Sequence, residues 1–250
     1  MEWYLIPALI GVGFLCGFIN TFAGSGSLIS LPMLMFMGLP ANVANGTNRI
    51  AILLQNVVGV ASFKQQKVFE WKEGIWLAIP AVIGSVIGAI FAVNINDRIM
   101  TRVIGGLLVV MFFLIIFKPD MWVRGKAGKI AGRPGILQLI IFFGIGLYGG
   151  FIQAGVGFFL IAGLVLGAGY DLVKTNAIKL LIVLIYTPFA LTVFIINDQV
   201  NWTAGLILAV GNMLGAFVAS RFAVSWGAKV IRIILLVIIF GAALKLILIP

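Results

Sequence analysis

The sequence has 250 residues, of which 62% are hydrophobic and 10% charged, and its mean hydropathy is +1.21. A soluble domain needs roughly a quarter of its residues charged to cover its surface, so this composition excludes a soluble protein and predicts lipid as the solvent. The net charge of +10 is explained mainly by basic residues in cytoplasmic loops and is compatible with anionic solutes, whereas no basic domain outside the membrane is predicted to bind nucleic acid.

Apolar segments recur from one end of the chain to the other, many of them near the length that spans a hydrocarbon core of roughly 30 Å. In the first half they cover residues 4–19, 28–37, 45–63, 75–93 and 103–117. In the second half they cover residues 136–152, 158–166, 175–196, 204–224 and 231–249. The stretch between the halves, 118–134, contains five basic residues and is predicted to be a cytoplasmic linker.

The two halves repeat each other at an offset of 131 residues. This offset pairs Trp71 with Trp202, since 202 − 71 = 131, and it also pairs Asn45 with Asn176. Several glycines fall in the same register, and Gly17 to Asn20 matches Gly150 to Gln153 after a shift of two residues. Chance apolar similarity would not place a Trp, an Asn and several glycines in one register. We therefore predict a first repeat at 1–117 and a second at 135–250.

Basic residues in the loops predict the orientation of the repeats. Lys64, Lys67 and Lys72 place the loop after the third segment inside, whereas the equivalent loop at 197–201 has no basic residue. The equivalent loops then lie on opposite sides of the membrane, with both termini outside. The predicted fold is an all-α polytopic membrane protein with two inverted repeats and about eight to ten membrane segments, including two short broken or re-entrant helices.

Each half contains a glycine-rich break before a short apolar segment. The first break runs through Gly24, Ser25, Gly26 and Ser27, and the second contains Gly155 and Gly157. At membrane depth, bare backbone must be hydrogen-bonded by protein, cavity water or a ligand, and the first amides of a helix favour an anion. The alternative is that these glycines only let helices pack closely.

A second polar cluster opens the third segment of each half. It contains Asn45, Thr47, Asn48 and Arg49 in the first half, and Asn176 and Lys179 in the second. On a helix, residues three and four positions apart lie on one face, so each cation faces an Asn. The Asn residues could cap helices and the cations could extend to the membrane interface; the alternative is that they form part of an anion site.

Other isolated polar residues carry less information. Gln55, Asn56 and Asn212 lie within apolar segments, where hydrogen bonds between helices are the expected use and a position lining a pathway is the alternative. All seven carboxylates fall at segment ends or in loops, the chain has no histidine, and Cys16 is its one cysteine. Enzymatic acid–base chemistry, a metal site and a bound cofactor are therefore not predicted.

The residues from Gly17 to Pro32, GFINTFAGSGSLISLP, and the segment ANGTNR at 44–49 resemble the TauE/SafE sulfite exporter family. The second half carries a weaker copy. The resemblance implies a bacterial inner-membrane exporter of small sulfur-containing anions. Ser25 and Ser27 replace the usual glycines, and Phe158 and Phe159 make the second break bulkier, so a sulfonate with an apolar part fits at least as well as sulfite.

We therefore predict a carrier that alternates access around two broken-helix N-termini. The predicted partners are a small anionic substrate and the lipid bilayer, and assembly as a homo-oligomer is left open. An anion channel and a non-transporting scaffold subunit are the alternatives. The predicted substrate-binding residues are Asn20, Gly24, Ser25, Gly26, Ser27, Asn45, Thr47, Asn48, Arg49, Gln153, Gly155, Gly157, Asn176 and Lys179.

Overall fold

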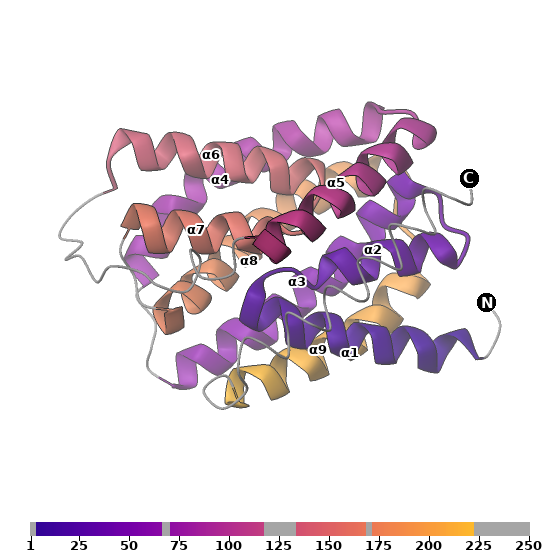
Figure 1. Ribbon diagram of the computed structural model, residues 1–250, viewed down its shortest axis with the longest axis horizontal. Helices are drawn as coiled ribbons and strands as arrows, with labels where there is room; N and C mark the ends of the chain where they lie inside the picture. The colour runs from indigo at the N-terminus through magenta and orange to yellow at the C-terminus, as the bar shows by residue number, and fades with distance from the viewer. Residues whose placement is uncertain (1–3, 67–70, 118–133, 169–171, 223–250) are drawn as a thin grey trace.

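The computed structural model describes residues 4–66, 71–117, 134–168 and 172–222, and the regular structure in these ranges is helical (Figure 1). The predicted segment 231–249 and linker residues 118–133 lie outside the described residues. The helices in the described ranges are α1 (Leu5–Ala23), α2 (Ser27–Phe36), α3 (Ala41–Gln65), α4 (Trp71–Asn94), α5 (Asp97–Phe117), α6 (Ile136–Phe151), α7 (Val156–Ala168), α8 (Leu172–Ile196) and α9 (Trp202–Phe222). The predicted all-helical fold is confirmed.

Helices in the described part of the chain have the length and composition of membrane segments. Three are long and apolar enough to cross a membrane, at Gly74–Asn94, Lys174–Ile196 and Trp202–Arg221. Shorter apolar helices are found at Leu5–Thr21, Ser27–Phe36, Ile136–Phe151 and Val156–Val165. Because helices satisfy their backbone groups internally, they are the expected form for such apolar sequence in lipid.

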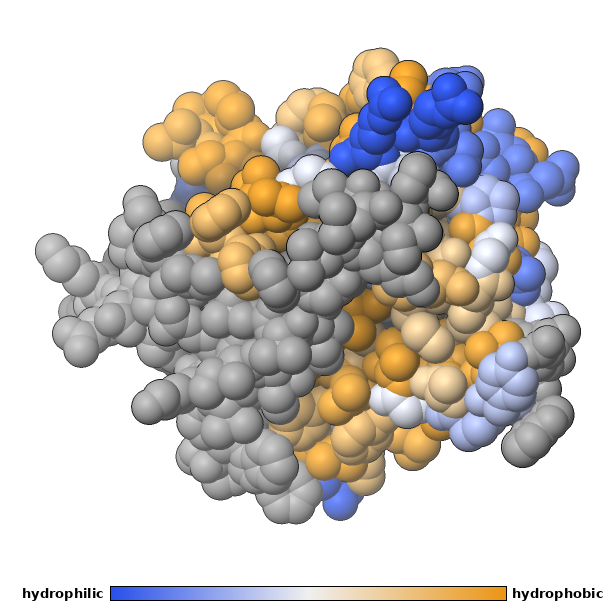
Figure 2. Space-filling model, turned by 45° about the vertical axis from the view of Figure 1, so that its right-hand side comes forward, coloured by the Kyte–Doolittle hydropathy of each residue, from blue (hydrophilic) through white to orange (hydrophobic). Residues whose placement is uncertain are grey.

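The outer surface is apolar where these helices face outward. Ile83 and Phe91 of α4 are more than half exposed, as is Leu214 of α9. Figure 2 shows hydrophobic residues over much of the described part of one face, with hydrophilic residues gathered mainly toward one edge. Exposed apolar patches of this extent are unusual in a soluble monomer and suit contact with lipid.

Several predicted segments begin or end inside the helix that contains them, and two of these differences concern the polar cluster. Helix α3 begins at Ala41 after Pro40, and α8 begins at Leu172, so both start before the apolar pattern does. The fixed φ of proline suits the position just ahead of a helix. Asn45 and Asn176 therefore lie inside their helices, and the interpretation that they cap helix starts is wrong.

Helix bounds in the two halves follow the 131-residue offset. Adding 131 to Leu5, Ala41 and Trp71, the first residues of α1, α3 and α4, gives Ile136, Leu172 and Trp202, the first residues of α6, α8 and α9. The packing has the same correspondence, because α1 packs extensively on α9 and α4 on α6. Each half thus places its first helix against the fourth helix of the other half.

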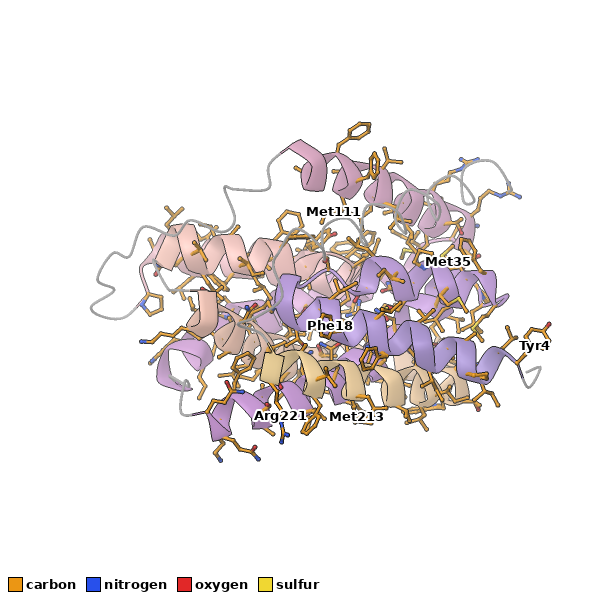
Figure 3. The ribbon with its side chains drawn as sticks, turned by 60° about the horizontal axis from the view of Figure 1, so that its bottom comes forward. Tyr4, Phe18, Met35, Met111, Met213 and Arg221 are labelled. Carbon is orange, nitrogen blue, oxygen red and sulfur yellow. The ribbon has the colours of Figure 1, made fainter. Side chains whose placement is uncertain are left out.

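Contacts along the helices give their relative directions. Gly13 of α1 lies against Leu208 of α9 and Gly17 against Asn212, so α1 and α9 run parallel. Figure 3 shows these two helices side by side, with Tyr4 at one end of the pair and Arg221 at the other. In contrast, α3 and α8 run antiparallel, because Gly46 lies against Phe194 and Gly59 against Leu180.

Glycines form the closest helix contacts. A Cβ placed on Gly84 or Gly88 of α4 would collide with the backbone of α6, and one on Gly211 or Gly215 of α9 would collide with the backbone of α1. The sequence motifs Gly84-x-x-x-Gly88 and Gly211-x-x-x-Gly215 are thus helix contacts, as small residues in membrane helices commonly are.

We expect Gly17→Ala to destabilise the protein by about 1–3 kcal/mol, the usual cost of overpacking. The added Cβ would meet the carbonyl group of Asn212, which is backbone and cannot rotate away. The measurement is the thermal unfolding midpoint in detergent. Gly11→Ala on the same helix is the matched control, since a Cβ there meets nothing within 4 Å. Equal midpoints for the two variants would contradict the packing.

Candidate functional site

The two predicted breaks meet in the structure. The amide of Gly157 donates to the carbonyl oxygen of Gly24 at 3.0 Å. A Cβ on either glycine would collide with the backbone of the other, so the two backbone segments touch with no side chain between them. Close approach of this kind is available only to glycine. Helices α2 and α7 therefore begin at one common point, contributed by both halves.

One glycine in each break, Gly24 in the first and Gly155 in the second, has a left-handed backbone conformation. Gly24, the C-cap of α1, has φ 69°, and Gly155 has φ 73°. Residues other than glycine are disfavoured in this region. Gly26 lies against the carbonyl of Cys16 on α1, and a Cβ on Gly155 would meet Met111 of α5, which Figure 3 labels. These contacts fix the direction in which α2 and α7 leave the junction.

A small pocket lies beside this junction. About 10 Å³ of it can be occupied by the centre of a water molecule, which is room for roughly one water. Its lining residues come from both halves, as Asn20 and Gln153 are counterparts (153 − 20 = 133), and so are Ile52 and Val183 (183 − 52 = 131). The full lining is Asn20, Ser27, Ile52, Asn56, Gln153, Val156, Gly157, Lys179, Leu180 and Val183.

Lys179 is the cation of this pocket. Its side chain is 1% exposed, and its Nζ donates to the carbonyl oxygens of Asn20 at 3.0 Å and Thr21 at 3.1 Å, and to Asn176 Oδ1 at 2.8 Å. The carbonyls belong to the last turn of α1, where the helix dipole is negative, and that of Asn20 also accepts from the amide of Gly24 at 2.9 Å. The interpretation that Lys179 reaches a membrane interface is wrong, because the side chain is buried inside the protein.

Arg49 has the equivalent position at the end of α6. Its Nη1 donates to the carbonyl oxygen of Gly149 at 3.0 Å and its Nη2 to that of Gly150 at 2.6 Å. Asn45 Nδ2 donates to the next carbonyl, that of Phe151, at 2.7 Å. The guanidinium lies 4.6 Å from the ring centroid of Phe194 and has no exposure. Arg49 does not line the pocket, and its expected extension to the interface is likewise wrong.

A cluster of amides joins three helices next to the pocket. Gln55 Oε1 accepts from Asn20 Nδ2 at 3.2 Å and from Asn212 Nδ2 at 3.3 Å, which links α3 to α1 and α9. Gln55 and Asn212 are fully buried. Hydrogen bonds between helices, the expected use of these two residues, are therefore what the structure contains.

Several other predicted site residues are engaged elsewhere. Thr47 Oγ1 accepts from the amide of Asn201 at 2.8 Å, in the loop before α9. Asn48 Oδ1 accepts from Ser30 Oγ at 2.6 Å, which ties α3 to α2. Ser25 is buried near the junction but does not line the pocket. Of the predicted set, the pocket collects Asn20, Ser27, Gln153, Gly157 and Lys179.

Other lining residues were not predicted as site residues. Asn56, for which a lining position was only the alternative, does line the pocket, beside Ile52, Leu180 and Val183. The apolar members carry no chemical signal in the sequence. Helical spacing from Asn48 does not separate Asn56 from Gln55, so the sequence held no signal that would have chosen Asn56.

Comparison with known proteins identifies the family. A family model described as sulfite exporter TauE/SafE matches residues 9–246. The chain belongs to the TauE/SafE family. It is 28% identical to the probable membrane transporter protein ORF9 of Sinorhizobium sp over 246 residues, which cover 98% of this chain and 94% of the relative. It is also 28% identical to the probable membrane transporter protein YfcA of Escherichia coli (strain K12), over 93% of this chain and 87% of that protein.

More distant TauE/SafE relatives match over similar lengths. A probable membrane transporter protein of Haemophilus influenzae is 23% identical over 97% of this chain and 94% of its own length. No solved structure matches the chain. The predicted family is confirmed, and because it is a family of membrane transporters, the chain is a multi-pass membrane protein and not an enzyme.

In this TauE/SafE member we expect Arg49→Met to destabilise the fold by about 3 kcal/mol, because two buried carbonyl oxygens at the end of α6 lose their donors. Arg49→Lys should recover only part of this, since an ammonium lacks the planar fork. Thermal unfolding in detergent measures both variants. Arg98→Met, at an exposed position on α5, is the control. A midpoint for Arg49→Met equal to that of the control would contradict the structural role.

Proposed function

We propose that this protein carries small sulfur-containing anions, such as sulfite or an organosulfonate, out of the cell by alternating access around the pocket beside Gly24 and Gly157. The family provides the substrate class, since its model is described as a sulfite exporter. The pocket provides the site, since it lies at the meeting point of two broken helices and both halves line it.

The observation that carries this proposal is the charge of the pocket. Lys179 is buried there, and the other buried charged residue in the described part of the chain is Arg49, a second cation. Asp97 and Asp198, the acids whose side chains are described, are both exposed. A buried cation without an acid partner is costly in a low-dielectric interior, and an anionic ligand supplies the missing charge.

The predicted residues then divide by role. Lys179 balances the charge of the anion, with Asn20, Ser27 and Gln153 as hydrogen-bonding neighbours. The amides of 24–27 and 155–157 remain proposed ligands, with Gly157 released from Gly24 when the site opens. Arg49, Asn45, Thr47 and Asn48 act indirectly by holding the helices around the site.

We further propose that the halves, 1–117 and 135–250, are inverted repeats joined by the cytoplasmic linker 118–134. The relative directions of three pairs of helices support this proposal. Helices α1 and α9 run parallel, α4 and α6 run parallel, and α3 runs antiparallel to its counterpart α8. Helices α2 and α7 start at the common junction as short re-entrant helices, which is a known plan for carriers with a site near the midplane.

Alternating access also has a physical basis in this arrangement. Lys179 of the second half is bonded to the end of α1 of the first half. An anion that approaches the ammonium competes with these carbonyl oxygens, so binding weakens a contact between the halves. Rocking of one half against the other, with the pocket as pivot, then exposes the site to each side in turn.

We expect Lys179→Met to lower uptake of labelled sulfite into proteoliposomes at least 10-fold, because the substitution keeps the side-chain length and removes the charge that pairs with the anion. Lys64→Met, at an exposed position in the last turn of α3, is the matched control and should transport normally. Saturable uptake with counterflow indicates a carrier, and linear flux indicates a channel. Absence of anion flux in the unmodified protein would favour the scaffold alternative.

We expect the ends of α3 and α8 to lie on opposite sides of the membrane. In a Cys16→Ser background, Asn197→Cys should react with a membrane-impermeant maleimide in intact cells, and Gln65→Cys should react only after lysis. Both positions are exposed in the structure. Labelling of both cysteines in intact cells would contradict the inverted arrangement, and the reverse pattern would place the linker outside.

A further inference from the structure

The pocket contains two side-chain oxygens that have no hydrogen-bond partner. They are Asn56 Oδ1 and Gln153 Oε1, and both residues are 1% exposed. Other buried polar atoms without partners occur in the described part of the chain, but of those residues Asn56 and Gln153 are the pair that line the pocket. Most buried polar groups are hydrogen-bonded, so two such acceptors in one small pocket need an explanation.

The free atom of Asn56 is an acceptor by necessity. Its Nδ2 donates at 2.7 Å to the carbonyl oxygen of Ile52, one helical turn earlier. A carbonyl oxygen can only accept, so the amide nitrogen must face it and the amide oxygen must face the other way. Asn56 therefore offers the pocket a hydrogen-bond acceptor and no donor.

Gln153 contributes the second free oxygen, from the opposite half of the chain. Its Nε2 donates to Thr187 Oγ1 of α8 at 3.1 Å, which leaves Oε1 without a partner. Asn56 is the counterpart of Thr187, the residue that Gln153 bonds, at the 131-residue offset (187 − 56 = 131). Both halves contribute to the same chemical feature.

Most of the donors that line the pocket are already used by the protein. The ammonium of Lys179 gives its three protons to three oxygens, Asn20 Nδ2 donates to Gln55, and the amide of Gly157 donates to Gly24. What the pocket offers a ligand is thus one positive charge, the hydroxyl of Ser27 and two oxygens that can only accept. A ligand complementary to it has a negative charge and a hydrogen-bond donor.

We infer that the pocket, which must widen from room for one water to admit an anion, selects a monoanion that also carries a hydroxyl or other hydrogen-bond donor, with Lys179 facing the charge and Asn56 and Gln153 accepting from the donor. This inference rests on the proposed function and specifies its substrate class. A single cation is neutralised by a single negative charge, whereas a dianion would leave an excess charge in the interior. An anion without a donor would displace water from the two acceptors and leave them unpaired.

The experiment compares two sulfonates of nearly equal shape, 2-hydroxyethanesulfonate and 1-propanesulfonate, in which a hydroxyl replaces a methyl group. Each competes with labelled sulfite for uptake into proteoliposomes containing the full chain. We expect the unmodified protein to prefer 2-hydroxyethanesulfonate by about 10-fold or more, since sites built to bond a substrate hydroxyl reject analogues that lack it. A ratio of inhibition constants does not depend on how much protein is folded.

Asn56→Leu should reduce this preference to within about 2-fold, because an apolar side chain of similar size replaces the acceptor. Asn212→Leu is the matched control: Asn212 is also a buried amide with an unpartnered oxygen, but it does not line the pocket, so the preference should be retained.

Equal inhibition by the two sulfonates, or a preference that survives Asn56→Leu, would overturn the inference while leaving anion transport intact. A requirement for Na⁺ that disappears in Asn56→Leu would also overturn it, because the oxygens would then hold a coupling cation. Absence of sulfite uptake in the unmodified protein would instead contradict the proposed function itself.

Discussion

The contact between the backbones of Gly24 and Gly157 is the constraint on which the rest of the structure depends. It places the starts of α2 and α7 at one point inside the protein, so that α1 and α6 also end inside the protein. The last carbonyl oxygens of a helix lack partners within the helix and need other hydrogen-bond donors, and this requirement is strict where water is scarce. Bringing two such ends together therefore demands a set of buried polar side chains that an ordinary apolar bundle does not need.

In this structure each half of the chain supplies hydrogen-bond donors to a helix end of the other half. Lys179 of α8 donates to the end of α1, and Arg49 of α3 donates to the end of α6. Each cation also contacts an Asn on its own helix, at 2.8 Å for Lys179 with Asn176 and 3.5 Å for Arg49 with Asn45. The end of the first helix of each half is therefore hydrogen-bonded by a side chain of the other half. The contacts of α1 on α9 and of α4 on α6 join the two halves further.

The sequence alone could predict the features that depend on local pattern. Glycines in register predicted both breaks, and the left-handed backbone at Gly24 and Gly155 bears out their role as turning points. Spacing also predicted that Arg49 would face Asn45, and Lys179 Asn176. Local pattern could not predict which carbonyl groups the cations bond, since Arg49 and Gly149 are 100 residues apart and their contact depends on tertiary packing. The predicted start of α3 is late for a related reason: Asn42, a buried polar residue whose Nδ2 donates to the carbonyl oxygen of Ile95 at 2.7 Å, interrupts the apolar pattern.

The unequal use of the two cations follows from the same geometry. The guanidinium of Arg49 spans two successive carbonyls and stacks over Phe194, so both of its Nη groups are held away from the pocket. The ammonium of Lys179 is a compact charge at the wall of the pocket, and its bonds can be exchanged one at a time. The chain thus places two cations at corresponding helix ends but only one at the wall of the pocket. Ile52 and Val183 are counterparts that face the pocket, whereas Lys179 has no charged counterpart among the residues that line it.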